Sequence, residues 1–222
     1  MALGRSSGRR AVTLSDGAAP GAPSCPACGE PLFVWLETEG WGPREDQVVD
    51  RCENCGLAVA RGAIPGADRV AADLVGETNG APVVTIRAAN TASLQAWLGA
   101  ENWAALRPGQ TSVTPTPKSA QLLLARRGLE PRRIRFLAGP GMASMWQTLL
   151  NLLTFHRDFA AEAIGRRLHP RGAKARAAYA IDAMVTVLAA VPTALLAVVL
   201  EGAAVLARRG GVIEITAARA RG

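Results

Sequence analysis

Strands are predicted where apolar and polar residues alternate along this chain of 222 residues. Residues 32–37, LFVWLE, alternate over a short stretch, and residues 132–139, RRIRFLAG, do the same. Residues 82–90, PVVTIRAAN, form a β-branched run between a proline and an asparagine, which predicts a buried strand followed by a turn. Residues 210–220, GGVIEITAARA, have the pattern of a last strand. Strands are therefore expected in both halves of the chain.

Helical spacing of apolar residues is found between these strands. Residues 93–106 place Leu94, Trp97 and Leu98 on one stripe of a predicted helix. Residues 115–131, PTPKSAQLLLARRGLEP, carry the clearest helical signals of the chain. They have a polar entry, three central leucines, two arginines in the last turn and a glycine as stop signal.

A strongly apolar segment follows, from residue 139 to residue 209. Residues 142–155 carry an apolar face broad enough to lie on a surface. Residues 183–200 contain no charged side chain and would extend for roughly 27 Å as a helix, enough to cross the core of a bilayer. Asp182 and Glu201 bound this run. It can be a transmembrane helix, a helix on the face of a bilayer or a helix buried in a soluble dimer.

The charges around this run bear on the choice. Basic residues flank it on both sides: Arg166, Arg167, Arg171, Lys174 and Arg176 before it, and Arg208 and Arg209 after it. They suit anionic lipid head groups but fix no orientation. If the last strand pairs with residues 132–139, the chain must return to the side it left, which favours an in-plane helix or a hairpin over a single crossing. We therefore expect a cytoplasmic protein at the inner face of the plasma membrane.

The composition of the chain bears on whether its partner is a nucleic acid. The net charge of +7 and the pI of about 10.2 suggest an anionic partner. Lysine occurs only at Lys118 and Lys174, however, and a bias toward arginine, alanine and glycine also arises from GC-rich coding sequence. A nucleic-acid-binding ribbon is therefore a hypothesis supported by charge alone. Residues 1–24 lack the apolar core of a secretory signal, which makes the reducing cytoplasm the expected compartment.

The four cysteines of the chain predict a metal site. They form two Cys-x-x-Cys pairs about two dozen residues apart: Cys25 with Cys28, and Cys52 with Cys55. This spacing is typical of a tetrahedral four-thiolate zinc site, in which each tight turn donates two ligands. Such a site has no open position and is structural. Two redox pairs or two disulfides are the alternatives, although no βαβ pattern typical of thioredoxins surrounds the cysteines.

Several segments resemble bacterial class I S-adenosylmethionine-dependent methyltransferases of the sugar and surface-polysaccharide type. The motif CPACG…RCENCGLAVA is similar to the zinc ribbon in front of many of these enzymes. Residues 82–106 resemble their fifth strand and following helix, residues 114–137 their terminal helix and sixth strand, and RRGGVIEITAAR their seventh strand. The resemblance implies a Rossmann-like sheet fragment.

The half of such an enzyme that binds the methyl donor is missing between these segments. That half needs a first strand with a glycine-rich loop and an acidic residue after the second strand. About twenty residues separate Ile64 from the strand at residues 82–90, whereas one strand-helix unit takes about thirty. Gly139 and Gly141 lie between a predicted strand and helix, but a simple turn explains them better than a phosphate loop. S-adenosylmethionine is therefore not expected to bind, and no cofactor-binding residue is assigned.

No catalytic residue is assigned either. His156 lies at the polar end of an apolar helix and His169 in a basic turn, which are ordinary helix-end and surface positions. The tryptophans Trp97, Trp103 and Trp146 are expected to be core or interfacial anchors, with base stacking as the alternative.

The predicted fold is of mixed α/β class, with a four-cysteine zinc ribbon, a C-terminal fragment of a Rossmann-like methyltransferase sheet and an apolar helical insertion. The expected organisation is a flexible basic tail (1–23), the ribbon (24–62), a strand-helix-strand fragment (63–138), the apolar helical insertion (139–210) and a final strand (211–222).

Two functional hypotheses follow from this organisation. The first is a non-catalytic zinc-ribbon accessory protein, derived from a methyltransferase and associated with a membrane, that acts with a full methyltransferase or a polysaccharide-assembly enzyme. The second is a methyltransferase whose cofactor site is completed by a partner chain.

Overall fold

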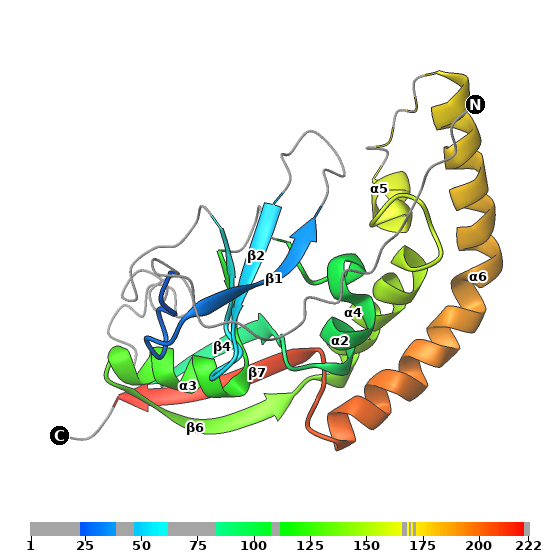
Figure 1. Cartoon of the computed structure of the whole chain (residues 1–222). Coiled ribbons are helices and arrows are strands. Elements are labelled where there is room, and N and C mark those ends of the chain that lie inside the picture. Colours follow the sequence, from blue (N-terminus) through cyan, green and yellow to red (C-terminus); the bar gives the residue numbers. More distant parts are fainter. Residues whose placement is uncertain are drawn as a thin grey trace.

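The computed structural model describes residues 23–38, 47–61, 83–107, 112–165, 168, 170 and 172–219. They form a mixed α/β fold with two antiparallel sheets and one long helix (Figure 1). The first sheet has the strand order β1 (Leu32–Thr38), β2 (Gln47–Cys52), β3 (Ala58–Ala60), β5 (Val113–Thr114). The strand predicted at residues 32–37 is thus confirmed, and it pairs with β2 as an antiparallel hairpin.

The second sheet has the order β4 (Val83–Ala89), β7 (Val212–Arg219), β6 (Leu129–Phe136). The last strand lies in the centre and is antiparallel to both neighbours, so the condition that it pairs with the strand at residues 132–139 is met. Alternate residues of β7, Ile213, Ile215 and Ala217, are buried in the core of this sheet.

Strand β4 is less buried than predicted, because it lies at the edge of its sheet. Its only neighbour among the described strands is β7. Ile86 alone is fully buried, while Val83, Thr85 and Arg87 are exposed. The prediction of a buried strand was therefore wrong, since a β-branched run does not reveal how many neighbours a strand will have.

Two helices connect the sheets. Helix α2 (Leu94–Gly99) continues into a single 3₁₀ turn, η1 (Ala100–Asn102), so the helix predicted for residues 93–106 is much shorter than expected. Helix α3 (Pro117–Arg126) confirms the clearest helical prediction. Thr116 caps it in a reciprocal pair of hydrogen bonds with Ser119, and Gly128 ends it at a positive φ of 64°.

The apolar insertion between β6 and β7 is helical throughout most of its length. It comprises α4 (Ala138–Asn151), the short α5 (Phe159–Ile164) and α6 (Ala173–Leu206). Helix α6 packs along α4, and both ends of the insertion meet the second sheet (Figure 1). At 34 residues, α6 is far longer than the uncharged run, and it bends along its length with Pro192 inside it.

Parts of the predicted organisation fall outside the described residues. These are most of the tail predicted for residues 1–23, the stretch 62–82 with the boundary between the first two domains, and His169.

Candidate metal centre

Two tight turns in the first sheet present the four cysteines. Cys25 and Cys28 lie in the turn before β1, while Cys52 ends β2 and Cys55 lies in the turn toward β3. Each pair is closed by a backbone hydrogen bond of 2.8 Å, from Gly29 to Cys25 and from Gly56 to Cys52. Both glycines have a positive φ, 84° and 74°. A glycine directly after each pair is therefore required by the left-handed turn that brings the two thiols together.

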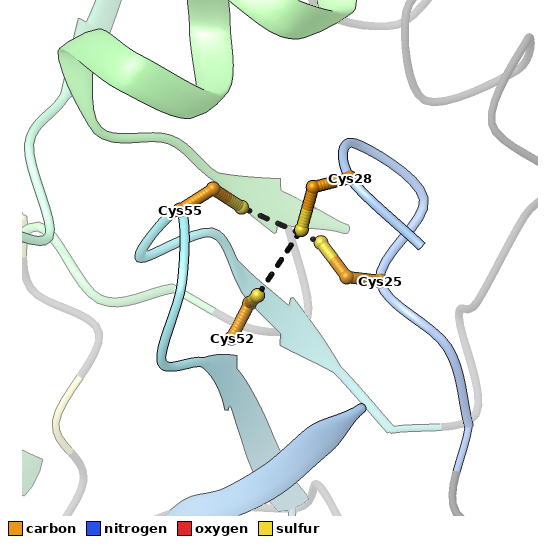
Figure 2. A group of neighbouring side chains, drawn as sticks. All are labelled: Cys25, Cys28, Cys52 and Cys55. Atoms are coloured by element: carbon orange, nitrogen blue, oxygen red, sulfur yellow. Dashed lines mark hydrogen bonds between the residues drawn. The ribbon is translucent and has the colours of Figure 1, made fainter. Parts of the chain in front are cut away.

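The four sulfur atoms converge on one point (Figure 2). The Sγ atoms of Cys25 and Cys55 are 3.5 Å apart, those of Cys28 and Cys52 are 3.4 Å apart, and all four lie within 4.8 Å of one another. Zinc holds thiolates at roughly 2.3 Å, which places the sulfurs of a tetrahedral site roughly 3.8 Å apart. The four cysteines are free thiols, and their arrangement fits a metal ion at the centre.

Burial and mutual hydrogen bonding shift the acidities of the thiols. Cys25, Cys52 and Cys55 are buried, and Cys28 is partly exposed. The bond with Cys55 lowers the pKa of Cys25 to about 5, and the same bond together with burial raises the pKa of Cys55. Burial also raises the pKa of Cys52. A bound divalent cation would remove this asymmetry, because metal-bound thiols are deprotonated outright.

The second cysteine turn, residues 52–56, is also hydrogen-bonded to residues before and within α3. Thr116, the N-cap of α3, donates its hydroxyl to the Cys55 carbonyl at 2.6 Å, and Thr91 donates to the Gly56 carbonyl at 2.7 Å. Lys118 donates to the backbone carbonyl and the side chain of Asn54.

Close packing accompanies these hydrogen bonds. A Cβ atom on Gly56 would lie 2.6 Å from Thr116 Cγ2. Leu123 of α3 belongs to the same buried cluster as Cys25, Cys52 and Cys55. The cysteine cluster and the first turns of α3 therefore share one core.

Two buried carboxylates fasten the apolar insertion, and the sequence patterns did not reveal this role. Asp182 accepts hydrogen bonds from the backbone N–H groups of Phe155 and His156, and it lies 2.6 Å from His156 Nδ1. His156 lies in the loop after α4, close to the predicted helix end. Its structural partner, Asp182, lies on α6.

The second carboxylate is Glu201, at the other end of the apolar run. It accepts hydrogen bonds from Gln95 Nε2 and from the Gly211 N–H, each at 2.7 Å. Burial raises the pKa of Glu201. A side chain on Gly141 would collide with this carboxylate, whereas one on Gly139 would meet nothing within 4 Å. Both glycines lie in the first turn of α4, where close packing requires a glycine at Gly141 but not at Gly139.

The three tryptophans singled out from the sequence lie in different surroundings. Trp103 is fully buried, and Trp146 donates its indole N–H to the Ala190 carbonyl and to Thr193 on α6. These two are anchors, as expected. Trp97 is 78% exposed, because Gln95 and Ala96 are buried in its place. The predicted stripe of Leu94, Trp97 and Leu98 is therefore wrong at Trp97.

Comparisons of the chain with protein-family models, with curated proteins and with solved structures found no match. The resemblance to methyltransferases consequently rests on the sequence segments alone.

Proposed function

We propose that this chain is a non-catalytic accessory protein, a zinc ribbon fused to a remnant of a class I methyltransferase. It attaches to the inner face of the plasma membrane and acts beside a full methyltransferase or a polysaccharide-assembly enzyme. The observation that carries the proposal is the stretch of chain between residue 61 and β4, which is too short to hold a site for the methyl donor. The four-cysteine cluster, in which all four side chains point at one centre, supports the ribbon. A metal held in this way stabilises a fold and offers no position to a substrate.

The second sheet supports the proposed origin. The three segments that resemble the fifth, sixth and seventh strands of these enzymes are β4, β6 and β7, and they pair in one sheet. The short stretch between residue 61 and β4 leaves too little chain for the strand-helix units that would hold the methyl donor. We therefore assign an accessory role to the retained part.

The apolar insertion supports the proposed location. Among the described residues, one helix, α6, is long and apolar enough to cross a membrane by length and composition, and only 11% of its most apolar window is buried. So much exposed apolar surface is unfavourable in water and marks an interaction site.

Calorimetric titration with S-adenosylmethionine tests the proposal. The purified chain, loaded with zinc, is expected to show no binding at micromolar to millimolar cofactor. Micromolar binding by this chain alone would overturn the proposal in favour of a methyltransferase. The positive control is the same titration of a full methyltransferase partner that crosslinking in membranes identifies, which should bind S-adenosylmethionine.

A further inference from the structure

The outer face of α6 is apolar without interruption. Its exposed side chains recur every three or four residues: Met184, Val187, Leu188, Val191, Leu195, Val198 and Val199. At the centre, Val191 is 68% exposed and Leu195 is 66% exposed. Asp182 and Glu201 project to the opposite side, where they are fully buried. The two carboxylates that bound the run in sequence therefore do not interrupt this face.

Both ends of the outer face are basic. Lys174 and Arg176 lie exposed in the first turn of α6, and Arg208 and Arg209 lie exposed just after its last residue. The 34 residues of the helix place the two groups on the order of 50 Å apart. The surface thus has a long apolar centre and a cationic group at each end.

These charges argue against a second copy of the chain as the occupant. Two α6 helices packed in parallel would bring Lys174 and Arg176 against their own copies. Packed antiparallel, they would bring these residues against Arg208 and Arg209. The acidic residues of α6, Asp182 and Glu201, are buried on the other side and cannot neutralise either arrangement. An anionic lipid surface supplies counter-charge at both ends.

The connections of α6 argue against a crossing. The insertion leaves β6 and returns to β7 at the same sheet, so a crossing by α6 requires a second one on the way out. Helix α4, with 14 residues, is roughly 21 Å long and does not span a core of roughly 30 Å. It also packs along the inner side of α6 and is hydrogen-bonded to it through Trp146.

We infer that α6 lies in the plane of an anionic membrane, with its outer face among the head groups and upper acyl chains and its basic ends on lipid phosphates. This inference rests on the proposed membrane-attached function and adds to it the class of lipid and the orientation of the helix. A helix with one wide apolar face, fixed to a folded body by its other face, is suited to such interfacial binding.

Vesicle sedimentation of the full, zinc-loaded chain tests the inference. Binding is expected on phosphatidylcholine vesicles that contain phosphatidylglycerol, and about ten-fold weaker binding on phosphatidylcholine alone. The bound protein is expected to leave the vesicles in alkaline carbonate. Equal binding to both vesicles would overturn the lipid class, and retention in carbonate would overturn the in-plane orientation.

Two pairs of variants locate the surface. The double variant Leu188→Ser/Leu195→Ser is expected to weaken vesicle binding more than ten-fold, and Lys174→Gln/Arg176→Gln to weaken it about ten-fold. The matched controls Val34→Ser and Arg133→Gln/Arg135→Gln change exposed residues of β1 and β6 and are expected to bind as the wild type. Circular dichroism and thermal unfolding confirm that each variant is folded. Equal loss in variants and controls would overturn the inference.

Size-exclusion chromatography with light scattering tests whether the outer face of α6 binds a second copy of the chain instead of a membrane. A stable dimer that Leu188→Ser/Leu195→Ser dissociates, with no vesicle binding by the wild type, would assign the outer face to a second copy. That result would overturn the lipid inference and leave the non-catalytic function standing, because the cofactor titration decides the latter independently.

Discussion

The metal cluster and the helical insertion are fastened by contacts of different range. The farthest of the paired thiols, Cys25 and Cys55, are 30 residues apart in sequence, and all four cysteines come from two turns of one small sheet. The insertion is held by Glu201 through Gln95, which is 106 residues away. The first region encloses its four thiols, while the second buries the carboxylates of Asp182 and Glu201 and exposes its apolar face. We therefore expect the cysteine cluster to depend on a bound metal for its stability and the insertion to present a binding surface.

Removal of the metal should produce the largest difference in stability between the ribbon and the insertion. A structural zinc site contributes about 10 kcal/mol or more of apparent binding free energy, so chelation should unfold the ribbon. Hydrogen exchange is expected to accelerate by about a hundred-fold or more in β1, β2 and β3, with α4 and α6 nearly unchanged.

The variant Cys52→Ser should reproduce the chelation result without a chelator. Asn54→Ala, in the same turn but outside the thiol cluster, is the control and should retain the metal. Uniform loss of protection over the whole chain would show that the two regions are not energetically separate.

Loss of the Asp182 carboxylate should destabilise the helical insertion. In Asp182→Ala, two backbone N–H groups and the His156 ring lose their acceptor, which should cost about 3 kcal/mol of unfolding free energy. The control Glu130→Ala removes an exposed ion pair with Arg132 and should cost less than about 1 kcal/mol. Denaturant unfolding measures both, and equal effects would refute a fastening role for Asp182.

A methyl group at Gly141 should have an intermediate effect. Gly141→Ala forces a Cβ against the Glu201 carboxylate and should cost about 1–3 kcal/mol by overpacking. Gly139→Ala, two residues earlier on the same helix, meets open space and should leave stability unchanged or raise it by up to about 1 kcal/mol. Thermal unfolding distinguishes the two variants, and a stable Gly141→Ala would show that α4 and α6 can separate freely.

The pH dependence of Glu201 should give the smallest effect. Because burial raises its pKa above the ordinary 4.5, the folded state holds its proton to higher pH than the unfolded state. Stability from this group is therefore present at low pH and falls as pH rises through the raised pKa. The melting temperature of the wild type minus that of Glu201→Gln should decrease from about pH 4 to about pH 7. An increase over that range would contradict the assignment.

The parts of the fold that local chemistry determines were predictable from the sequence. The spacing of Cys25, Cys28, Cys52 and Cys55 predicted their cluster, because each pair belongs to one tight turn. Helix α3 was predictable from its entry residues and Gly128, because caps act within a single turn.

Features that depend on distant partners were not predictable in the same way. Helix α2 ends early, at Ala100 with a φ of 45°, and it buries Gln95 and Ala96 while Trp97 is exposed. Asp182 and Glu201 bound the apolar run in the sequence, and both are hydrogen-bonded and buried away from its exposed face. A lone carboxylate at each end of an apolar run was the available signal, but it does not show on which side of the helix the partners lie.

Native mass spectrometry shows whether the four cysteines form one structural metal site. We expect one zinc ion per chain, with all four cysteines unmodified and protected from alkylation until the zinc is removed. A metal-free chain that carries two disulfides, or thiols that cycle with a redox partner, would contradict it.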